Sequence, residues 1–348
     1  MRTLNLTIAI LLFLSTFHGY GQVKEKRDKS QYLRVVFYNV ENLFDTIDDP
    51  LINDADFLPD ARIPWTGERY ELKLDRISEV IEALGNKAPA GIVGLCEVEN
   101  QKVLEDLVRS PRILQYRYQI IHYDSPDERG IDNALLYDPL QFQPVYHTVV
   151  PVIFPFDPED KTRDILYIKG IHPKRKKDTL HLYVNHWPSR WGGAETSEPK
   201  RMQAARVLRH HVDSLLAINS ETLLLVMGDF NDEPDDQSML EVLQALPLEE
   251  DPANHKLYNL MFPAHKRGEG TIYWRDWDMF DQIILNGWFW NKKKGIGYRD
   301  EEAGIFSEEW LMFTTPEGIL RPNRTSAREY YGGFSDHLPV YIDLILKK

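Results

Sequence analysis

The chain has 348 residues, enough for one large domain or two small ones, and its 43% hydrophobic content provides for a sizeable core. It carries 41 Lys and Arg against 54 Asp and Glu, and the net charge of −13 argues against broad electrostatic capture of nucleic acid. The single cysteine, Cys96, excludes an intrachain disulfide, and we expect it to be a buried packing residue.

The first 22 residues have the pattern of a signal peptide. Arg2 supplies the positive start, residues 6–17 form a mostly apolar run too short to span a bilayer, and Gly19 and Gly21 supply small residues for cleavage. No cysteine lies nearby, which argues against a lipoprotein; a retained membrane anchor is the alternative. We therefore expect a secreted or periplasmic mature chain, residues 23–348, with 40 basic and 54 acidic residues and no membrane span.

Secondary structure is predicted from the period of the apolar residues. Helical spacing predicts helices over residues 70–84, 103–108, 200–218 and 239–246. A long acidic loop is expected over residues 43–69, and its length indicates function. The basic run at 174–177 is interpreted as a solvated hairpin tip, with a phosphate contact as the alternative. Short apolar runs predict strands over residues 33–40, 91–96, 118–122, 133–137, 142–150, 165–171, 180–184, 223–227, 279–285 and 338–346.

The order of these elements favours a single domain. Strands outnumber helices, both occur in each half of the chain, and we find no clear repeat and no Gly/Ser-rich linker. Two packed sheets with helices on the outside are therefore expected.

Polar residues recur at the ends of the predicted strands. Carboxylates and amides without cysteine ligands suit a hard cation such as Mg²⁺ or Mn²⁺. Histidines beside several acids can donate to phosphoryl oxygens, and the set describes metal-assisted attack of water on a phosphate ester. The residues are Asn39, Glu41, Glu97, His186, Asp229, Asn231, Asp281, Asp336 and His337.

Six short motifs resemble, in order, those of the endonuclease/exonuclease/phosphatase superfamily, and the resemblance covers about residues 33–345. That group includes pancreatic-type deoxyribonucleases, apurinic endonucleases, sphingomyelinases and inositol phosphatases. The resemblance implies an α+β fold, a four-layer αββα sandwich of two packed mixed β-sheets flanked by helices, with the site at one edge of the sheets. The motifs are YNVEN at 38–42, LCE at 95–97, NHW at 185–187, GDFND at 228–232, FDQI at 280–283 and SDHLPV at 335–340.

The resemblance also implies a metal site. Glu97 resembles the principal ligand, Asn39 and Glu41 match positions beside the metal, and Asp336 matches a nearby second acid. Glu41 stands where apurinic endonucleases carry Asp, which puts a second-metal role for it in doubt. For Asn39, a simple cap at the end of a strand is the alternative.

Catalytic roles follow from the same resemblance. Asp229 matches the residue that orients or deprotonates the attacking water, and Asn231 a phosphate-contacting amide. Asp281 and His337 match an Asp–His pair at the scissile phosphate, and His186 matches a second histidine of the deoxyribonuclease-like members. A structural bond to a backbone amide is the alternative for Asp281.

The substrate is left open. A phosphate ester is expected, and Arg129 and Arg190 are candidate phosphate contacts, with ordinary surface arginines as the alternative. The leading hypothesis is a secreted phosphodiesterase or nuclease, supported by His186 and by aromatics that can stack bases, Trp65, Tyr273, Trp274 and Trp277. The alternatives are an enzyme acting on a lipid, inositol or sugar phosphate, which the negative charge favours slightly, and an inactive binding module. No protein partner can be inferred.

The signal-peptide interpretation predicts where the mature protein begins. Protein from its native host should start near Gln22 or Val23 and be found outside the cytoplasm. N-terminal mass spectrometry of fractionated cells measures both, and a mature cytoplasmic protein that retains Met1 would contradict the interpretation.

Overall fold

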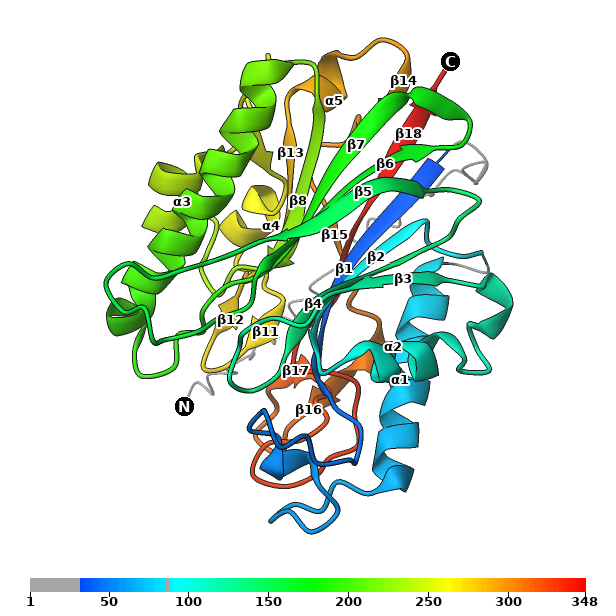
Figure 1. Ribbon diagram of the computed structural model, residues 1–348, viewed down its shortest axis with the longest axis vertical. Coiled ribbons are helices and arrows are strands. Elements are labelled where there is room, and N and C mark those ends of the chain that lie inside the picture. The colour runs from blue at the N-terminus through cyan, green and yellow to red at the C-terminus, as the bar shows by residue number, and fades with distance from the viewer. Residues whose placement is uncertain (1–31, 86–87) are drawn as a thin grey trace, which may run out of the picture.

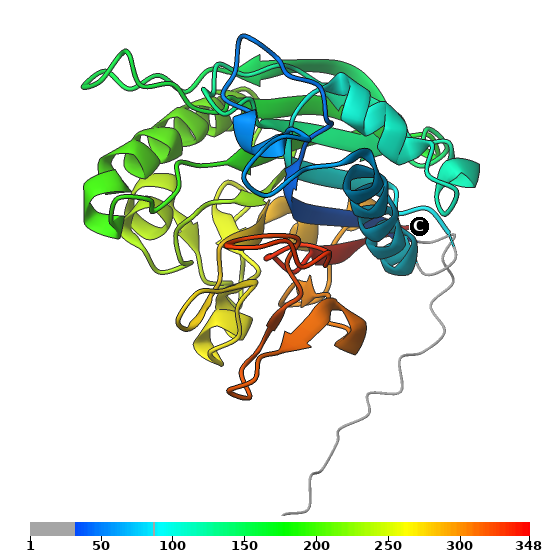
Figure 2. The ribbon, with the colours of Figure 1, turned by 90° about the horizontal axis from the view of Figure 1, so that it is seen from below.

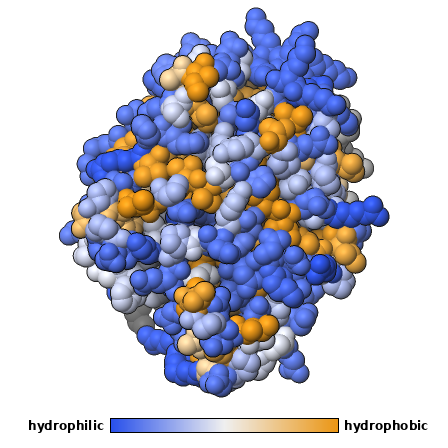
Figure 3. Space-filling model, viewed as in Figure 1, coloured by the Kyte–Doolittle hydropathy of each residue, from blue (hydrophilic) through white to orange (hydrophobic). Residues whose placement is uncertain are grey.

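The structure is a computed structural model that describes residues 32–85 and 88–348. The predicted signal peptide, residues 1–22, lies outside the described residues. Within the described ranges, no helix has both the length and the apolar character needed to cross a membrane. The surface facing the viewer in Figure 1 is mostly hydrophilic, with its hydrophobic residues in separate patches (Figure 3).

Two large mixed sheets form the centre of the molecule. In the first sheet β1 pairs with β2 in parallel and with β18 antiparallel. Its strands run in the order β14 (Gly295–Gly297), β18 (Val340–Lys347), β1 (Tyr32–Leu43), β2 (Ile92–Val98), β4 (Asp132–Tyr137) and β3 (Gln119–His122), with β15 (Gly304–Ile305) also paired to β18.

The second sheet is built in the same mixed way. Here β7 and β8 are parallel, and β13 lies antiparallel to β8. The order is β5 (Gln143–Val150), β6 (Ile165–His172), β7 (Arg175–His186), β8 (Leu223–Asp229), β13 (Asp281–Asn286), β10 (Leu257–Asn259) and β9 (Ala245–Leu246).

The remaining elements lie outside these sheets. Two short hairpins are formed by β11 (Ile272–Tyr273) with β12 (Trp277–Asp278) and by β16 (Met312–Thr314) with β17 (Leu320–Pro322). The helices are α1 (Gly67–Gly85), α2 (Gln101–Val108), α3 (Ala194–Ile218), α4 (Phe262–Lys266) and α5 (Trp288–Asn291), with short helical turns η2 (Ala55–Phe57), η3 (Leu114–Tyr116), η4 (Ser238–Leu243) and η5 (Glu309–Leu311).

Three buried apolar clusters hold the layers together. One lies between the two sheets, one joins the first sheet to α1 and α2, and one joins the second sheet to α3. Figure 2 shows α1 and α3 on opposite outer sides of the sheets. The expected four-layer αββα sandwich is therefore confirmed.

Some predicted boundaries were wrong. The helix expected over residues 239–246 is a short π-helical turn that ends at Gln244, whose φ of 58° is left-handed, and the chain then enters β9. Helix α3 begins six residues before the predicted start at Lys200 and includes Pro199 as its sixth residue, which has no backbone N–H to donate to the preceding turn.

Two expectations about loops are met by the structure. Residues 44–66 contain only the turn η2. The basic run at 174–177 lies at the tip of the β6–β7 hairpin, with Lys174 in the turn and residues 175–177 at the start of β7. Because β7 continues for 12 residues to His186, this turn is roughly 35 Å from the end that carries the histidine. A phosphate contact by the basic run at the candidate site is therefore excluded.

Strand alternation aims one polar residue from each of four strands at the space between the sheets. In β8, Leu223, Leu225 and Met227 enter the inter-sheet core, and Asp229 continues that row two residues later. The same i+2 rule places three more polar side chains on the inter-sheet face, namely Asn39 after Phe37 in β1, His186 after Val184 in β7, and Asp281 before Ile283 in β13.

The inter-sheet core should dominate stability. Leu225→Ala removes a fully buried side chain at its centre and should lower the free energy of unfolding by about 2–5 kcal/mol. Leu51→Ala, at a side chain that is 89% exposed, is the matched control and should change it by less than about 0.5 kcal/mol. Urea unfolding followed by circular dichroism measures both, and equal effects would contradict the assignment of this core.

Candidate active site

Asn39 joins the two sheets at the centre of the site. Its side-chain amide donates to Glu97 Oε1 of β2 and to Asp229 Oδ2 of β8, both at 3.0 Å. Its Oδ1 accepts the backbone N–H of Glu41 at 3.0 Å. The amide is fully buried, so its bonds hold two carboxylates from different sheets in fixed positions.

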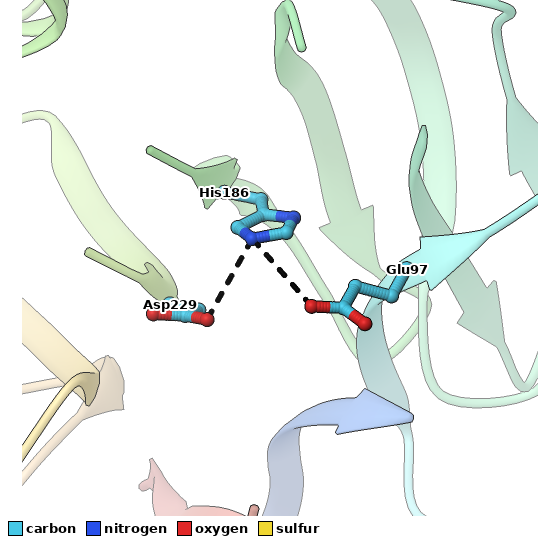
Figure 4. A group of neighbouring side chains, drawn as sticks. All are labelled: Glu97, His186 and Asp229. Carbon is cyan, nitrogen blue, oxygen red and sulfur yellow. Dashed lines mark ion pairs between the residues drawn. The ribbon is translucent and has the colours of Figure 1, made fainter. Parts of the chain in front are cut away.

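Glu97, His186 and Asp229 face one another at this point (Figure 4). His186 Nε2 lies 3.8 Å from Glu97 Oε1 and 3.7 Å from Asp229 Oδ2. Burial, with Arg163, Arg129 and His337 nearby, lowers the pKa of His186 well below its usual value, so the ring is neutral. Its Nδ1 is buried and has no hydrogen-bond partner in residues 32–85 and 88–348.

Asp229 is a buried acid among other acids. Burial, aided by the charges of Asp281 and Glu97 and opposed by His337, raises the pKa of its carboxyl to about 7. Its Oδ1 accepts the backbone N–H of Asn231 at 2.9 Å. A carboxylate in this setting favours a neighbouring cation or a proton, as expected of a group that receives a proton from water.

Asp281 and His337 form the predicted pair. His337 Nδ1 lies 2.7 Å from Asp281 Oδ2, while Nε2 lies 3.8 Å from Asp229 Oδ2. Burial by itself lowers the pKa of His337, but the carboxylates of Asp281, Asp229 and Asp336 outweigh it and raise the pKa well above its usual value. His337 is therefore a cation whose Nε2 faces the centre of the site.

Strained backbone is concentrated at the site. Four non-glycine residues here are left-handed: Glu41 (φ 51°), Asn42 (56°), Glu97 (62°) and Asn231 (51°). At Glu97 the strain has a clear effect. The register of β2 shifts between Cys96 and Val98, which leaves the Glu97 carboxylate to accept from Asn42 N–H and Asn39.

Sequence reasoning missed a buried arginine that holds the end of β7. The guanidinium of Arg163 donates to the backbone carbonyls of His186 and Trp187 and to the carboxylate of Asp127, the last at 2.9 Å. Asn231 donates its side-chain amide to the same Trp187 carbonyl at 3.1 Å. Arg163 precedes β6 in an irregular segment, so no periodicity or motif marks it.

Glu41 and Asp336 lie apart from the Glu97 group. The carboxylate of Glu41 accepts from Arg324 and from the backbone of Thr325, and Arg324 also donates to Asp336 at 2.9 Å. Burial and Asp336 raise the pKa of Glu41 to about 7, while Lys73 and Arg324 lower it. Neither acid belongs to the groups of acids and histidines with converging ligand atoms that contain Glu97 or Asp229.

The two predicted arginines differ in whether their side chains are available to contact a substrate. Arg129 is half-exposed, and its charge acts on His186, so it lies near the site. Arg190 is committed to structure, because it donates to the Asn231 carbonyl at 2.8 Å and pairs with Asp232 and Asp236. Asp232 is buried and accepts from both Arg190 and Arg201.

A family model described as the endonuclease/exonuclease/phosphatase family matches residues 34–346. The chain belongs to this family. No curated protein matches it in sequence.

Solved structures share the fold at low sequence identity. A Caenorhabditis elegans TDP2 is 15% identical, with 90% of this chain and 98% of that one covered and a TM-score of 0.53. The human Nocturnin catalytic domain with bound sulfate is 18% identical, with coverages of 90% and 94% and a TM-score of 0.53. A mannosyl-6-phosphatase from Bacteroides thetaiotaomicron is 14% identical, with coverages of 90% and 99% and a TM-score of 0.55.

The donor set fits a divalent metal. Glu97, His186 and Asp229 each offer one ligand atom, and these atoms lie within 4.8 Å of one another. Carboxylate oxygens and a neutral imidazole are all ligands of divalent ions, and the partial exposure of Glu97 gives an ion access from solvent.

The Asp281–His337 pair makes a prediction about pH. His337→Ala should lower kcat on a diester by on the order of 10²–10³, because a cationic donor to the transition state is lost. Asp281→Asn should cost less but move the alkaline limb of the kcat profile to lower pH, since this carboxylate raises the histidine pKa.

The measurement is a kcat–pH series for both variants and the double variant. His147→Ala, at an exposed histidine of β5, is the control and should leave kcat unchanged. Additive losses in the double variant would show that the two residues do not act as a unit.

Proposed function

We propose that this protein is a divalent-metal-dependent hydrolase of phosphate esters that uses a metal-activated water. The observation that carries the proposal is the convergence of Glu97, His186 and Asp229 from three strands beside the Asp281–His337 pair. A rigid buried arrangement of this kind supports chemistry without reorganisation of the site.

The chain's own groups have distinct roles in this proposal. Glu97 holds the ion, and when bound the ion polarises a phosphoryl oxygen and lowers the pKa of a bound water. Asp229 orients this water and accepts its proton. His337 donates from Nε2 to a phosphoryl oxygen while Asp281 keeps the proton on Nδ1. The neutral His186 would offer Nε2 to the ion beside Glu97, and Asn231 completes the polar wall around the phosphate.

A phosphodiester of nucleic acid is the substrate we favour. Trp191 is 90% exposed on the loop after β7, and Trp274 is 75% exposed at the tip of the β11–β12 hairpin. Both segments adjoin site residues, because β7 ends at His186 and Ile272 of the hairpin bridges to His337. Exposed aromatics beside a phosphate site can stack bases. Trp65, in contrast, is buried and donates to the Phe44 carbonyl, so it packs the loop.

A lipid, inositol or sugar phosphate is the second candidate, favoured by the net charge of −13, which repels long polyanions. The two candidates are separated by rates on plasmid DNA, RNA, bis-p-nitrophenyl phosphate, sphingomyelin, inositol phosphates and a sugar 6-phosphate. We also propose that the enzyme acts outside the cytoplasm, as the N-terminal sequence pattern indicates.

Metal dependence tests the proposal directly. Activity should require Mg²⁺ or Mn²⁺ and disappear with EDTA, and Glu97→Gln should weaken Mn²⁺ binding at least tenfold because the ligand loses its charge. Glu99→Gln is the matched control, since Glu99 accepts from the backbone of Asp45 and not from the site. Full activity in EDTA, or wild-type Mn²⁺ affinity in Glu97→Gln measured by calorimetry, would refute it.

A further inference from the structure

The two acids Glu41 and Asp336 already share a cation that belongs to the protein. Arg324 Nη2 lies 3.1 Å from Glu41 Oε1 and 2.9 Å from Asp336 Oδ2, so one guanidinium bridges both carboxylates. Its Nε also donates to Glu41 Oε1, at 3.2 Å, and to the Ser326 carbonyl, at 2.7 Å. Both contacts with Glu41 end on the same oxygen, Oε1, so they are charge-assisted contacts with one oxygen and not a two-oxygen fork.

The second oxygen of Glu41 is occupied as well. It accepts the backbone N–H of Thr325 at 2.6 Å, and the carboxylate is almost fully buried. Behind it the buried ammonium of Lys73, on α1, donates to Thr325 Oγ1 and to the Phe334 carbonyl at 2.8 Å. Each oxygen of Glu41 thus has a hydrogen-bond partner in the Arg324–Thr325 segment.

The backbone explains this direction. By simple alternation Glu41 would follow Asn39 onto the inter-sheet face. The register of β1 shifts after Asn39, and Glu41 and Asn42 are both left-handed, so the Glu41 side chain turns toward the Arg324 segment instead.

Charge balance divides the site into two parts. Glu41 and Asp336 are matched by Arg324 and Lys73, so this part is neutral without any metal. In the other part, the ligand atoms of Glu97, His186 and Asp229 converge within 4.8 Å of one another, so this part offers the place for an ion.

We propose that the guanidinium of Arg324 takes the cation position between Glu41 and Asp336, so that the chain binds one divalent ion, at Glu97, and not a second. This inference rests on the proposed metal dependence and adds the number of divalent ions bound per chain. It removes Glu41 and Asp336 from the metal ligands and makes Arg324 the residue that sets the number of ions.

Counting bound Mn²⁺ by equilibrium dialysis and calorimetry tests the inference without any substrate. The wild-type protein should bind one ion per chain. Arg324→Ala should uncover the two carboxylates and bind two ions, whereas Arg324→Lys, which keeps a cation there, should bind one.

Arg267→Ala is the matched control. Arg267 also bridges two carboxylates, Glu269 at 2.6 Å and Glu302 at 2.8 Å, but these are nearly half exposed and already solvated. Arg267→Ala should still bind one ion. A second ion in Arg324→Ala but not in Arg267→Ala then comes from the site uncovered at Glu41 and not from the loss of an arginine in general.

Glu41→Gln provides a second test if Arg324→Ala does not fold. Because Glu41 is not a ligand in this proposal, Mn²⁺ affinity should stay within about twofold of wild type, whereas loss of a ligand costs on the order of 10–100-fold. Two ions in the wild type, one ion in folded Arg324→Ala, or a tenfold loss in Glu41→Gln would each overturn the inference. No bound ion in the wild type would instead overturn the proposed metal dependence itself.

Discussion

The site depends on polar contacts that cross between the two sheets at the end of their shared core. Asn39 of the first sheet bonds Asp229 of the second, and Asp281 of the second sheet bonds His337, which lies three residues before the start of the first sheet's β18. These groups are buried, so an unpaired member would be costly, and the apolar rows below them hold the sheets in register. Side-chain positions at the site are therefore set by core packing as much as by the polar groups themselves.

Burial also sets the electrostatics. Asp281 outweighs the burial of His337 and keeps that ring charged, while the nearby His186, without a close carboxylate bond, becomes neutral. Two histidines within one site thus differ in charge because His337 bonds the Asp281 carboxylate, with Asp229 and Asp336 nearby, whereas His186 lies beside Arg163 and Arg129.

The left-handed residues divide the acids between two tasks. Strain at Glu97 leaves its carboxylate in the group with His186 and Asp229, and strain at Glu41 directs its carboxylate to Arg324. Two glutamates that both follow predicted strands consequently have different neighbours, Arg324 for Glu41 and His186 for Glu97. The free-energy cost of these left-handed conformations is offset by the surrounding hydrogen bonds, which hold each residue in place.

The long buried strands were predictable from the sequence because apolar periodicity is a local property, whereas the αββα order and the meaning of the six motifs came from the resemblance to the family. The short strands from β9 to β12 and from β14 to β17 were not, since two or three residues carry no period and form only when a partner strand is present. The prediction of a helix over residues 239–246 was wrong for a related reason. Gln244 is left-handed and ends the short helical turn that forms there. Only the tertiary structure decided that Arg163 holds β7, that Arg190 is committed to Asp232, and that Arg324 faces Glu41 and Asp336. Those arginines pair with acids distant in the chain, and no local pattern encodes which acid a folded backbone brings within reach.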